Sequence, residues 1–190
     1  MGYFSGTQTI GILGGGQLGK MLLTTTRQWD LNTKVMDPNP AAPSRIACNT
    51  FVTGDLMDYD SVVAFGENLD VLTIEIENIN ADALVTLEKK GVKVYPQANV
   101  LMIIQNKCLQ KKFYKTHLIP TAPFQLFDSK NSLKDAIVRG LVSFPFVWKS
   151  EAMGYDGYGV KILRSNQDIE DVSNGPCMSE DLIAIDKELG

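Results

Sequence analysis

Short apolar segments alternate with amphipathic segments through the first half of the chain. The apolar segments predict strands at 9–13, 34–37, 49–52, 70–78 and 92–96. The amphipathic segments predict helices at 20–29, 58–68 and 81–90, the last of them ended by Gly91. Strands that alternate with helices of this length are typical of an α/β, doubly wound, Rossmann-like parallel sheet, which binds ligands at the carboxyl ends of its strands.

The pattern changes after Pro96. Further strands are predicted at 124–127, 144–149, 160–163 and 181–185, and further helices at 100–105, 106–117, 132–139 and 166–172. This half favours an α+β arrangement with an antiparallel sheet. Pro145 suggests that its strand starts at a sheet edge. On the helix at 106–117, we expect Lys111, Lys112 and Lys115 to form a solvated face.

Composition and charge narrow the class of protein. The chain has 190 residues, of which 44% are hydrophobic and 21% are charged, as in an ordinary globular domain. A net charge of −4 gives no basic surface for nucleic acid, and the apolar runs are far shorter than the ~18 residues of a membrane span. The three widely spaced cysteines indicate reduced thiols in a cytoplasmic protein. Residues 1–8 lack the features of a signal peptide and predict a disordered leader.

A glycine-rich turn follows the first predicted strand. Residues 14–19, Gly-Gly-Gly-Gln-Leu-Gly, fit the pattern G-x-G-x-x-G between a strand and a helix, and Asp37 follows near the spacing of a ribose-binding acid. These features are compatible with an NAD site. We favour a tight turn without a dinucleotide, because Asp37 precedes a proline-rich loop in which aspartate equally well caps a turn.

Two glutamates lie near the end of the predicted strand 70–78. Period-two alternation places Glu75 and Glu77 on the same side of that strand, and Gln17 follows the end of the first strand. Two carboxylates together bind hydroxyl or amine groups of a ligand, or act as acid and base. The alternative is that one caps the next helix and the other is solvated. We expect at least one of them to be functional.

The stretch 146–160 combines a lysine with a glycine-rich loop. Lys149 ends a strand, and Gly154, Gly157 and Gly159 follow before the next strand. Such glycines let backbone N–H groups approach an anion, and the lysine adds a full positive charge, so the stretch suits a polyphosphate. The alternative is a glycine-rich hairpin that binds no ligand and leaves its lysine solvated.

Together these motifs resemble the ATP-grasp superfamily and, within it, the 5-(carboxyamino)imidazole ribonucleotide synthetases. The matching segments are 14–19, 73–78, 117–123 and Lys149 with 154–159. The Gly-Gln-Leu-Gly and Gly-Tyr-Asp-Gly elements are the specific ones. The resemblance implies a leader at 1–8, a pre-ATP-grasp domain at 9–97, a first ATP-grasp subdomain at 98–180 and the start of a second at 181–190.

The resemblance implies an ATP-dependent carboxylation in purine biosynthesis. ATP would phosphorylate bicarbonate to carboxyphosphate, and aminoimidazole ribonucleotide would take the carboxyl group, giving carboxyaminoimidazole ribonucleotide, ADP and phosphate. ATP and Mg²⁺ are the implied cofactors, and relatives are commonly dimers. A related enzyme uses formate instead, but the Gly-Tyr-Asp-Gly element favours bicarbonate. An NAD-linked oxidoreductase and a non-catalytic nucleotide-binding module remain the competing hypotheses.

The resemblance also implies roles for individual residues. Tyr155 and Asp156 would face the imidazole substrate as catalytic residues. The residues implied to bind the ribonucleotide are Gln17, Leu18 and one of Glu75 and Glu77. The residues implied to bind ATP are Lys107, Lys149, Gly154, Tyr155, Asp156, Gly157, Tyr158, Gly159, Val160, Glu180, Asp181, Leu182, Ile183 and Glu188. In this set, 154–160 would form a flap over the phosphates, 180–183 an adenine-clamping hinge, and Glu188 the ribose contact.

Some features depart from the family. Tyr158 stands where many members have a basic residue, and Lys20 replaces a common arginine. Members also have about as many residues again, including the acidic residues that hold magnesium, and ATP-grasp chemistry needs that metal to bridge phosphates. We therefore predict that this chain is a fragment and is inactive alone in a phosphate-release assay with ATP, bicarbonate and aminoimidazole ribonucleotide.

Overall fold

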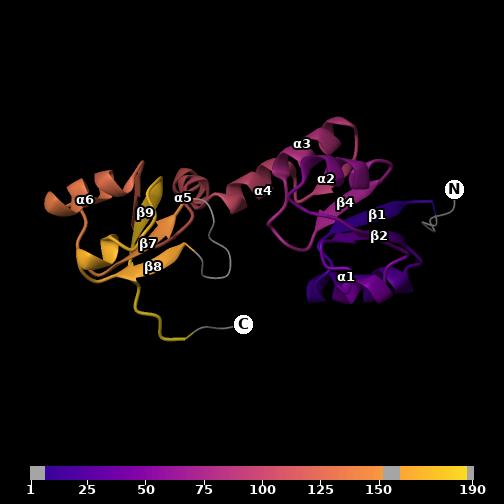
Figure 1. Cartoon of the computed structure of the whole chain (residues 1–190), viewed down its shortest axis with the longest axis horizontal. Coiled ribbons are helices and arrows are strands. Elements are labelled where there is room, and N and C mark those ends of the chain that lie inside the picture. Colours follow the sequence, from indigo (N-terminus) through magenta and orange to yellow (C-terminus); the bar gives the residue numbers. More distant parts are fainter. Residues whose placement is uncertain (1–6, 152–158, 188–190) are drawn as a thin grey trace. The chain divides into compact units, whose positions relative to one another are not determined.

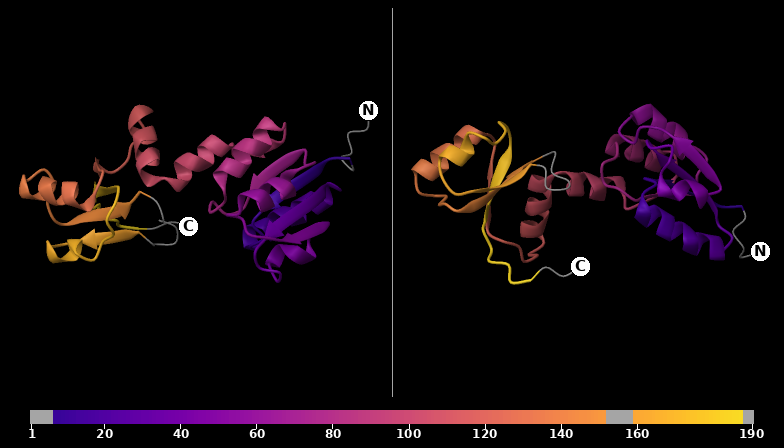
Figure 2. Two further views of the ribbon diagram at one scale, coloured as in Figure 1. Left: turned by 45° about the horizontal axis from the view of Figure 1, so that its top comes forward. Right: turned by 60° about the horizontal axis from the view of Figure 1, so that its bottom comes forward.

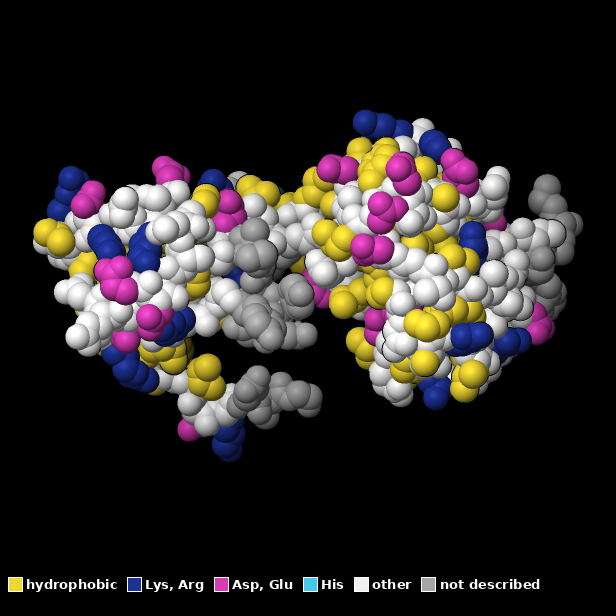
Figure 3. Space-filling model, in the orientation of Figure 1, with side chains coloured by type: hydrophobic (Ala, Val, Ile, Leu, Met, Phe, Trp, Pro, Cys, Tyr) yellow, Lys and Arg dark blue, Asp and Glu magenta, His cyan; other side chains and the backbone are white. Residues whose placement is uncertain are grey.

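The computed structural model describes residues 7–151 and 159–187. The chain forms two compact units, Met1–Met102 and Ile103–Gly190. In the described ranges, no helix combines the length and the apolar character that a membrane-spanning segment needs. On the face drawn in Figure 3, acidic and basic side chains of the described residues are interspersed.

The first unit contains a five-stranded parallel sheet with the strand order β3-β2-β1-β4-β5 (Figure 1). Its strands are β1 (Thr9–Leu13), β2 (Asn32–Asp37), β3 (Thr50–Thr53), β4 (Val71–Ile74) and β5 (Lys93–Tyr95). Its helices are α1 (Gln17–Gln28), α2 (Tyr59–Gly66) and α3 (Ala81–Lys89), with a 3₁₀ turn, η1, at Pro43–Ile46. The predicted doubly wound parallel sheet is confirmed.

Helices cover both faces of this sheet, α1 on one face and α2 with α3 on the other (Figure 2). Because successive strand residues point to opposite faces, Ile12 packs with Leu23 of α1, whereas Leu13 packs in the larger core with Leu84 of α3. Because this sheet is covered on both faces, the central strands β1 (Thr-Ile-Gly-Ile-Leu) and β4 (Val-Leu-Thr-Ile) are largely apolar, which explains why the sequence predicts a strand at each.

The direction of strand addition changes at β1, which has β2 on one side and β4 on the other. Ligands of doubly wound sheets bind at such a point, in the crevice beyond the carboxyl ends of the strands. The segments that follow β1 and β4 are the glycine turn and residues 75–77. The fold therefore brings the two predicted substrate-binding segments to one edge of the sheet.

The second unit contains a four-stranded antiparallel sheet with the order β6-β9-β7-β8. Its strands are β6 (Phe124–Phe127), β7 (Phe146–Ser150), β8 (Val160–Leu163) and β9 (Cys177–Asp181). Its helices are α5 (Lys107–Thr116) and α6 (Lys130–Val138), with a 3₁₀ turn, η2, at Gln167–Ile169, and α4 (Ala98–Gln105) spans the boundary between the units. The predicted α+β arrangement is confirmed.

Alternation along β7 divides the second sheet into an apolar face and a polar face. Phe146 and Trp148 lie in a core with Leu133 of α6. Lys149 points to the opposite face, where α5 and the sheet enclose a cavity. β7 is an inner strand, with β8 and β9 beside it, and it begins after Pro145. The prediction that this strand starts at an edge is therefore wrong.

Two predicted elements of the second unit also differ. The helix expected at 166–172 is only the short turn η2, because the Asp168 carboxylate accepts hydrogen bonds from the backbone N–H groups of Arg164 and Ser165 and fixes a turn there. The strand expected at 181–185 lies earlier, since β9 ends at Asp181.

The three cysteines, Cys48, Cys108 and Cys177, are free and buried, as expected for reduced thiols. Burial is the main cause that raises the pKa of the Cys108 thiol to about 11. This thiol is therefore protonated at neutral pH and acts as a small apolar side chain of α5.

Candidate functional site

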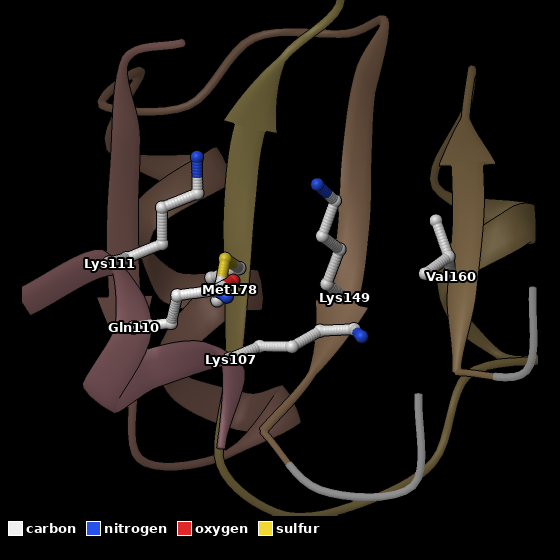
Figure 4. A pocket seen from close by; sticks show the side chains of 6 residues that line it. All are labelled: Lys107, Gln110, Lys111, Lys149, Val160 and Met178. Carbon is white, nitrogen blue, oxygen red and sulfur yellow. The ribbon is translucent and has the colours of Figure 1, made fainter. Parts of the chain in front are cut away.

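A cavity of about 220 Å³ lies between α5 and the sheet of the second unit. Its lining comes from α5, β7, β8 and β9 (Figure 4) and consists of Lys107, Gln110, Lys111, Lys149, Val160 and Met178. Three of these side chains are lysines, so the cavity suits an anionic ligand. The sequence predicts Lys107, Lys149 and Val160 as ATP-binding residues, and the structure brings these three together.

The register of β7 and β9 brings Lys149 close to Glu180. Lys149 lies opposite Met178, and Val147 lies opposite Glu180. Lys149 and Glu180 are therefore diagonal neighbours on one face of the sheet. Their side chains form an ion pair between Lys149 Nζ and Glu180 Oε2.

A second lysine contacts the same carboxylate from α5. Lys111 Nζ donates a hydrogen bond to Glu180 Oε1 at 2.6 Å and another to Thr121 Oγ1. Lys111 is only 7% exposed. The prediction of a solvated lysine face is therefore wrong for Lys111, because Glu180 supplies the buried partner that a buried cation requires. Lys112 and Lys115 are exposed as predicted.

The two lysines determine the charge of Glu180. Burial acts to raise the pKa of this carboxyl, but the hydrogen bonds and charges of Lys111 and Lys149 outweigh it, so the pKa of Glu180 is lowered from its ordinary value of 4.5. Glu180 is therefore an anion at neutral pH. With two ammonium groups around one carboxylate, the cluster has a net charge of +1.

The lowered pKa of Glu180 predicts acid sensitivity of the second unit. The folded state binds fewer protons at this site, so the stabilisation is complete above the ordinary pKa of 4.5 and is lost as the pH falls through the lowered value. We expect the unfolding free energies of the wild type and of Glu180→Gln to converge as the pH falls below the ordinary pKa of 4.5. Urea unfolding followed by Trp148 fluorescence, in a Trp29→Phe background, measures this difference, and a difference independent of pH would contradict it.

Lys107 is the first residue of α5. Asn106 caps the helix, since its Oδ1 accepts a hydrogen bond from Leu109 N at 2.8 Å. The backbone N–H of Lys107 donates to the Glu151 carbonyl at 3.0 Å, which ties the helix to the end of β7. The first turn contains no acidic residue. The positive end of the helix dipole therefore adds to the potential of Lys107 and favours an anion there.

Most of the predicted phosphate flap lies outside the described residues. Gly154, Tyr155, Asp156, Gly157 and Tyr158 belong to this part.

The described end of the flap, Gly159 and Val160, is close to the cavity. Gly159 has a φ of +68°, and its carbonyl accepts a hydrogen bond from Ser150 N at 2.8 Å. This bond closes the base of the loop directly beside Lys149. Val160, the first residue of β8, lines the cavity.

The predicted adenine hinge is divided between a strand and the segment after it. Glu180 is buried within β9, and Asp181 is its last residue. Leu182 and Ile183 follow the strand and are 37% and 54% exposed. Glu188, the predicted ribose contact, lies outside the described residues.

In the first unit, the glycine turn leads from β1 into α1. Gly14 has a φ of +98°, and its N–H donates to the Met36 carbonyl at 2.9 Å. The helix begins at Gln17, earlier than the predicted 20–29, and its N-cap residue Gly16 provides no side-chain cap. Gln17 and Leu18 are exposed in the first turn. The N–H groups of that turn point out of the helix N-terminus, where they favour a phosphate.

Asp37 stabilises the glycine turn. Its Oδ2 accepts a hydrogen bond from Gly15 N at 2.7 Å, and its Oδ1 accepts one from Asn39 N at 2.8 Å. Both carboxylate oxygens are engaged by backbone next to the turn. This arrangement agrees with the turn interpretation and not with a ribose-binding acid of an NAD site.

Glu75 approaches the same turn. A Cβ built on Gly16 would lie 2.6 Å from Glu75 Oε1, and one built on Gly14 would lie 2.8 Å from Glu75 Oε2. Glu75 is partly buried and Glu77 is exposed. β4 ends at Ile74, short of the predicted 70–78, so strand alternation does not extend through the two glutamates and the argument that it aligns them is wrong.

No group of three or more His, Cys, Asp or Glu side chains is arranged to hold a metal ion within the two described ranges. We therefore assign no magnesium ligand to these residues.

Sequence reasoning missed three side chains of the cavity, Gln110, Lys111 and Met178. The helical spacing from Lys107 is i+3 for Gln110 and i+4 for Lys111, which places all three on one helix face. This helical spacing is the sequence signal that could have identified Gln110 and Lys111 as lining residues. Met178 had none, because the position of β9 was predicted wrongly.

Two family models match the chain. The model described as "Ribonucleotide synthetase preATP-grasp domain" matches residues 7–105, and the model described as "ATP-grasp domain" matches residues 112–190.

Individual proteins are similar over nearly the whole chain. Phosphoribosylaminoimidazole carboxylase of Candida glabrata is 32% identical, over 96% of this chain and 33% of that protein. The crystal structure of N5-carboxyaminoimidazole ribonucleotide synthetase from Thermotoga maritima has a TM-score of 0.82 and 30% identity, over 94% of this chain and 47% of that one. N5-carboxyaminoimidazole synthase from Aspergillus clavatus, in complex with ADP and 5-aminoimidazole ribonucleotide, has a TM-score of 0.81 and 27% identity, over 95% and 47%. The chain thus spans between a third and a half of the lengths of these proteins.

Proposed function

This chain belongs to the ribonucleotide synthetase family of ATP-grasp proteins, and we propose that its second unit binds ATP in the cavity between α5 and the sheet. We further propose that a protein with the full length of the relatives uses this ATP to carboxylate aminoimidazole ribonucleotide with bicarbonate, by way of carboxyphosphate. The observation that carries the proposal is the cluster of three lysines in one cavity, two of them sharing the Glu180 carboxylate.

The charges of this cavity fit a polyphosphate. Lys149 and Lys107 supply cations from a strand end and from a helix N-terminus, and ammonium groups bind phosphate oxygens through charge-assisted hydrogen bonds. β7 ends at Ser150, and the glycine-rich segment 154–159 follows it in the sequence. In this proposal its backbone N–H groups cover the phosphates and exclude water from the reactive intermediate, with Tyr155 and Asp156 toward the imidazole substrate. In the same proposal, Leu182 and Ile183 contact the adenine of ATP, and Glu188 contacts its ribose.

The ribonucleotide is proposed to bind to the first unit, at the carboxyl ends of β1 and β4. Its phosphate suits the uncapped N-terminus of α1 at Gln17 and Leu18. Glu75 is our choice over Glu77 as the partner of its hydroxyl or amine groups, because Glu75 lies against the glycine turn. The structure of the Aspergillus clavatus relative with ADP and aminoimidazole ribonucleotide supports two separate ligands of these kinds in the family.

Isothermal titration of the chain with ATP plus magnesium, and separately with NADH, tests the proposal that the second unit binds ATP. We expect saturable binding of ATP and none of NADH. Binding of NADH without binding of ATP would overturn the proposal in favour of an oxidoreductase. Phosphate release with bicarbonate and aminoimidazole ribonucleotide then tests the carboxylation in a protein of the relatives' full length.

Magnesium as the ion that accompanies ATP, a homodimer, and a cytoplasmic location are further parts of this proposal. The magnesium and the homodimer rest on the family resemblance, and the cytoplasmic location rests on the three free cysteines. Light scattering during size-exclusion chromatography measures the oligomeric state.

A further inference from the structure

We propose that Lys111 is a positioning residue that neutralises Glu180 and thereby leaves the positive charge of Lys149 available to the phosphates of the nucleotide. This inference rests on the proposed function, because it assumes that a polyphosphate enters the cavity. It assigns a role to a residue that the sequence alone placed on a solvated face.

Lys111 is held firmly from several directions. Its ammonium group donates to Glu180 Oε1 at 2.6 Å and to Thr121 Oγ1. The same nitrogen lies 5.5 Å from the centre of the Phe124 ring and 5.9 Å from that of Tyr114, where the ring faces favour a cation. A lysine with these partners loses them if it moves toward a ligand. Lys111 is therefore suited to stay with Glu180 when the cavity is occupied.

Lys149 is more exposed than Lys111 and has fewer described partners. Its side chain is 26% exposed, against 8% for Lys111 and 10% for Glu180. Its described ion-pair partner is Glu180 Oε2, whereas Lys111 engages Oε1. Lys149 is thus the member of the cluster that can turn to an incoming phosphate while the other oxygen of the carboxylate remains paired.

The net charge of the cluster then decides the affinity for an anion. Two lysines and one carboxylate give +1, and removal of Lys111 gives 0, so that Lys149 and Glu180 would cancel each other. In a partly desolvated cavity, one unit charge several ångströms away changes anion affinity by roughly tenfold or more. A residue with only a packing role would lower stability without this dependence on the neighbouring carboxylate.

Titration calorimetry with sodium tripolyphosphate at low salt tests the inference without involving adenine recognition. We expect Lys111→Met to weaken binding by about tenfold or more, and Glu180→Gln to strengthen it. The double variant Lys111→Met/Glu180→Gln restores the net charge of +1 and is expected to bind within about threefold of the wild type. Lys112→Met is the matched control, since it removes the same charge from an exposed position of the same helix.

Several results would overturn the inference. Equal affinities of Lys111→Met and Lys112→Met would do so, and so would a double variant as weak as Lys111→Met. If Lys111→Met does not fold, as judged by circular dichroism, Glu180→Gln decides alone, because weaker binding of tripolyphosphate by that variant contradicts the charge argument. Failure of the wild type to bind either ATP or tripolyphosphate would instead refute the proposed function.

Discussion

Replacing Lys149 by methionine is expected to weaken ATP binding by about 100-fold, which corresponds to roughly 2.7 kcal/mol. The change removes a charge-assisted hydrogen bond to phosphate, which contributes roughly 1.5–3 kcal/mol. It also lowers the net charge of the cluster from +1 to 0, because Glu180 and Lys111 remain as a neutral pair. Methionine keeps the length and the apolar part of the side chain, so the neighbouring Met178 and Val160 keep their packing.

Lys161→Met is the control for this variant. Lys161 lies on the neighbouring strand β8, where it pairs with Asp171 at 2.8 Å outside the cavity, so this change alters the total charge equally. Calorimetric titration with ATP measures both affinities, and thermal unfolding verifies that both variants fold. Lys149→Arg is expected to retain part of the affinity. If Lys149→Met binds ATP as tightly as Lys161→Met does, then Lys149 does not contact the nucleotide.

The parts of the fold that the sequence predicted are those set by local patterns. The predicted strands 9–13, 124–127 and 160–163 have the observed bounds. In the parallel sheet, burial on both faces makes a central strand such as β1 a short, largely apolar run that is bounded by turn residues. One helix end was also predicted from a local signal, since Gly91 follows α3 directly after its C-cap residue Lys90 and has a φ of +94°.

Long-range pairing could not be predicted in the same way. β9 has the sequence Cys-Met-Ser-Glu-Asp, which has no clear apolar alternation and is a strand because β6 and β7 pair with it on both sides. The burial of Lys111 depends on Glu180, which is 69 residues away in the sequence. Periodicity can place a lysine on a helix face, but it cannot show that the carboxylate of a distant residue such as Glu180 lies opposite that face.

The glutamates after β4 show a further limit of prediction from sequence alternation. Alternation treats Glu75 and Glu77 alike, but β4 ends at Ile74 and the chain bends directly after it. Glu75 N donates a hydrogen bond to the Leu13 carbonyl at 2.7 Å, and the Glu75 side chain is the nearest neighbour of a Cβ built on either Gly14 or Gly16 in the glycine turn. The chemistry at this edge of the sheet was therefore predictable as a pair of candidates and not as a single residue.

Replacing Gly14 by alanine is expected to destabilise the first unit by roughly 3 kcal/mol, the largest stability change that we predict. Gly14 has a φ of +98°, which an L-residue adopts only under strain. In addition, the new Cβ would lie 3.0 Å from Glu75 Cβ and 2.8 Å from Glu75 Oε2. The Cβ of Glu75 cannot swing away as a side-chain end can, so the backbone must move on one side of the crevice.

Gly91→Ala separates the two causes. Gly91 has a nearly equal φ of +94°, but a Cβ there would have no heavy atom within 4 Å. This variant should therefore show the backbone strain alone, roughly 1–2 kcal/mol. Hydrogen exchange of the β1 and β4 amides measures both variants in the same unit. The excess loss in Gly14→Ala reports how rigidly Glu75 is held against the turn, and equal losses would mean that the backbone at Glu75 shifts without cost and that the contact with the turn is not rigid.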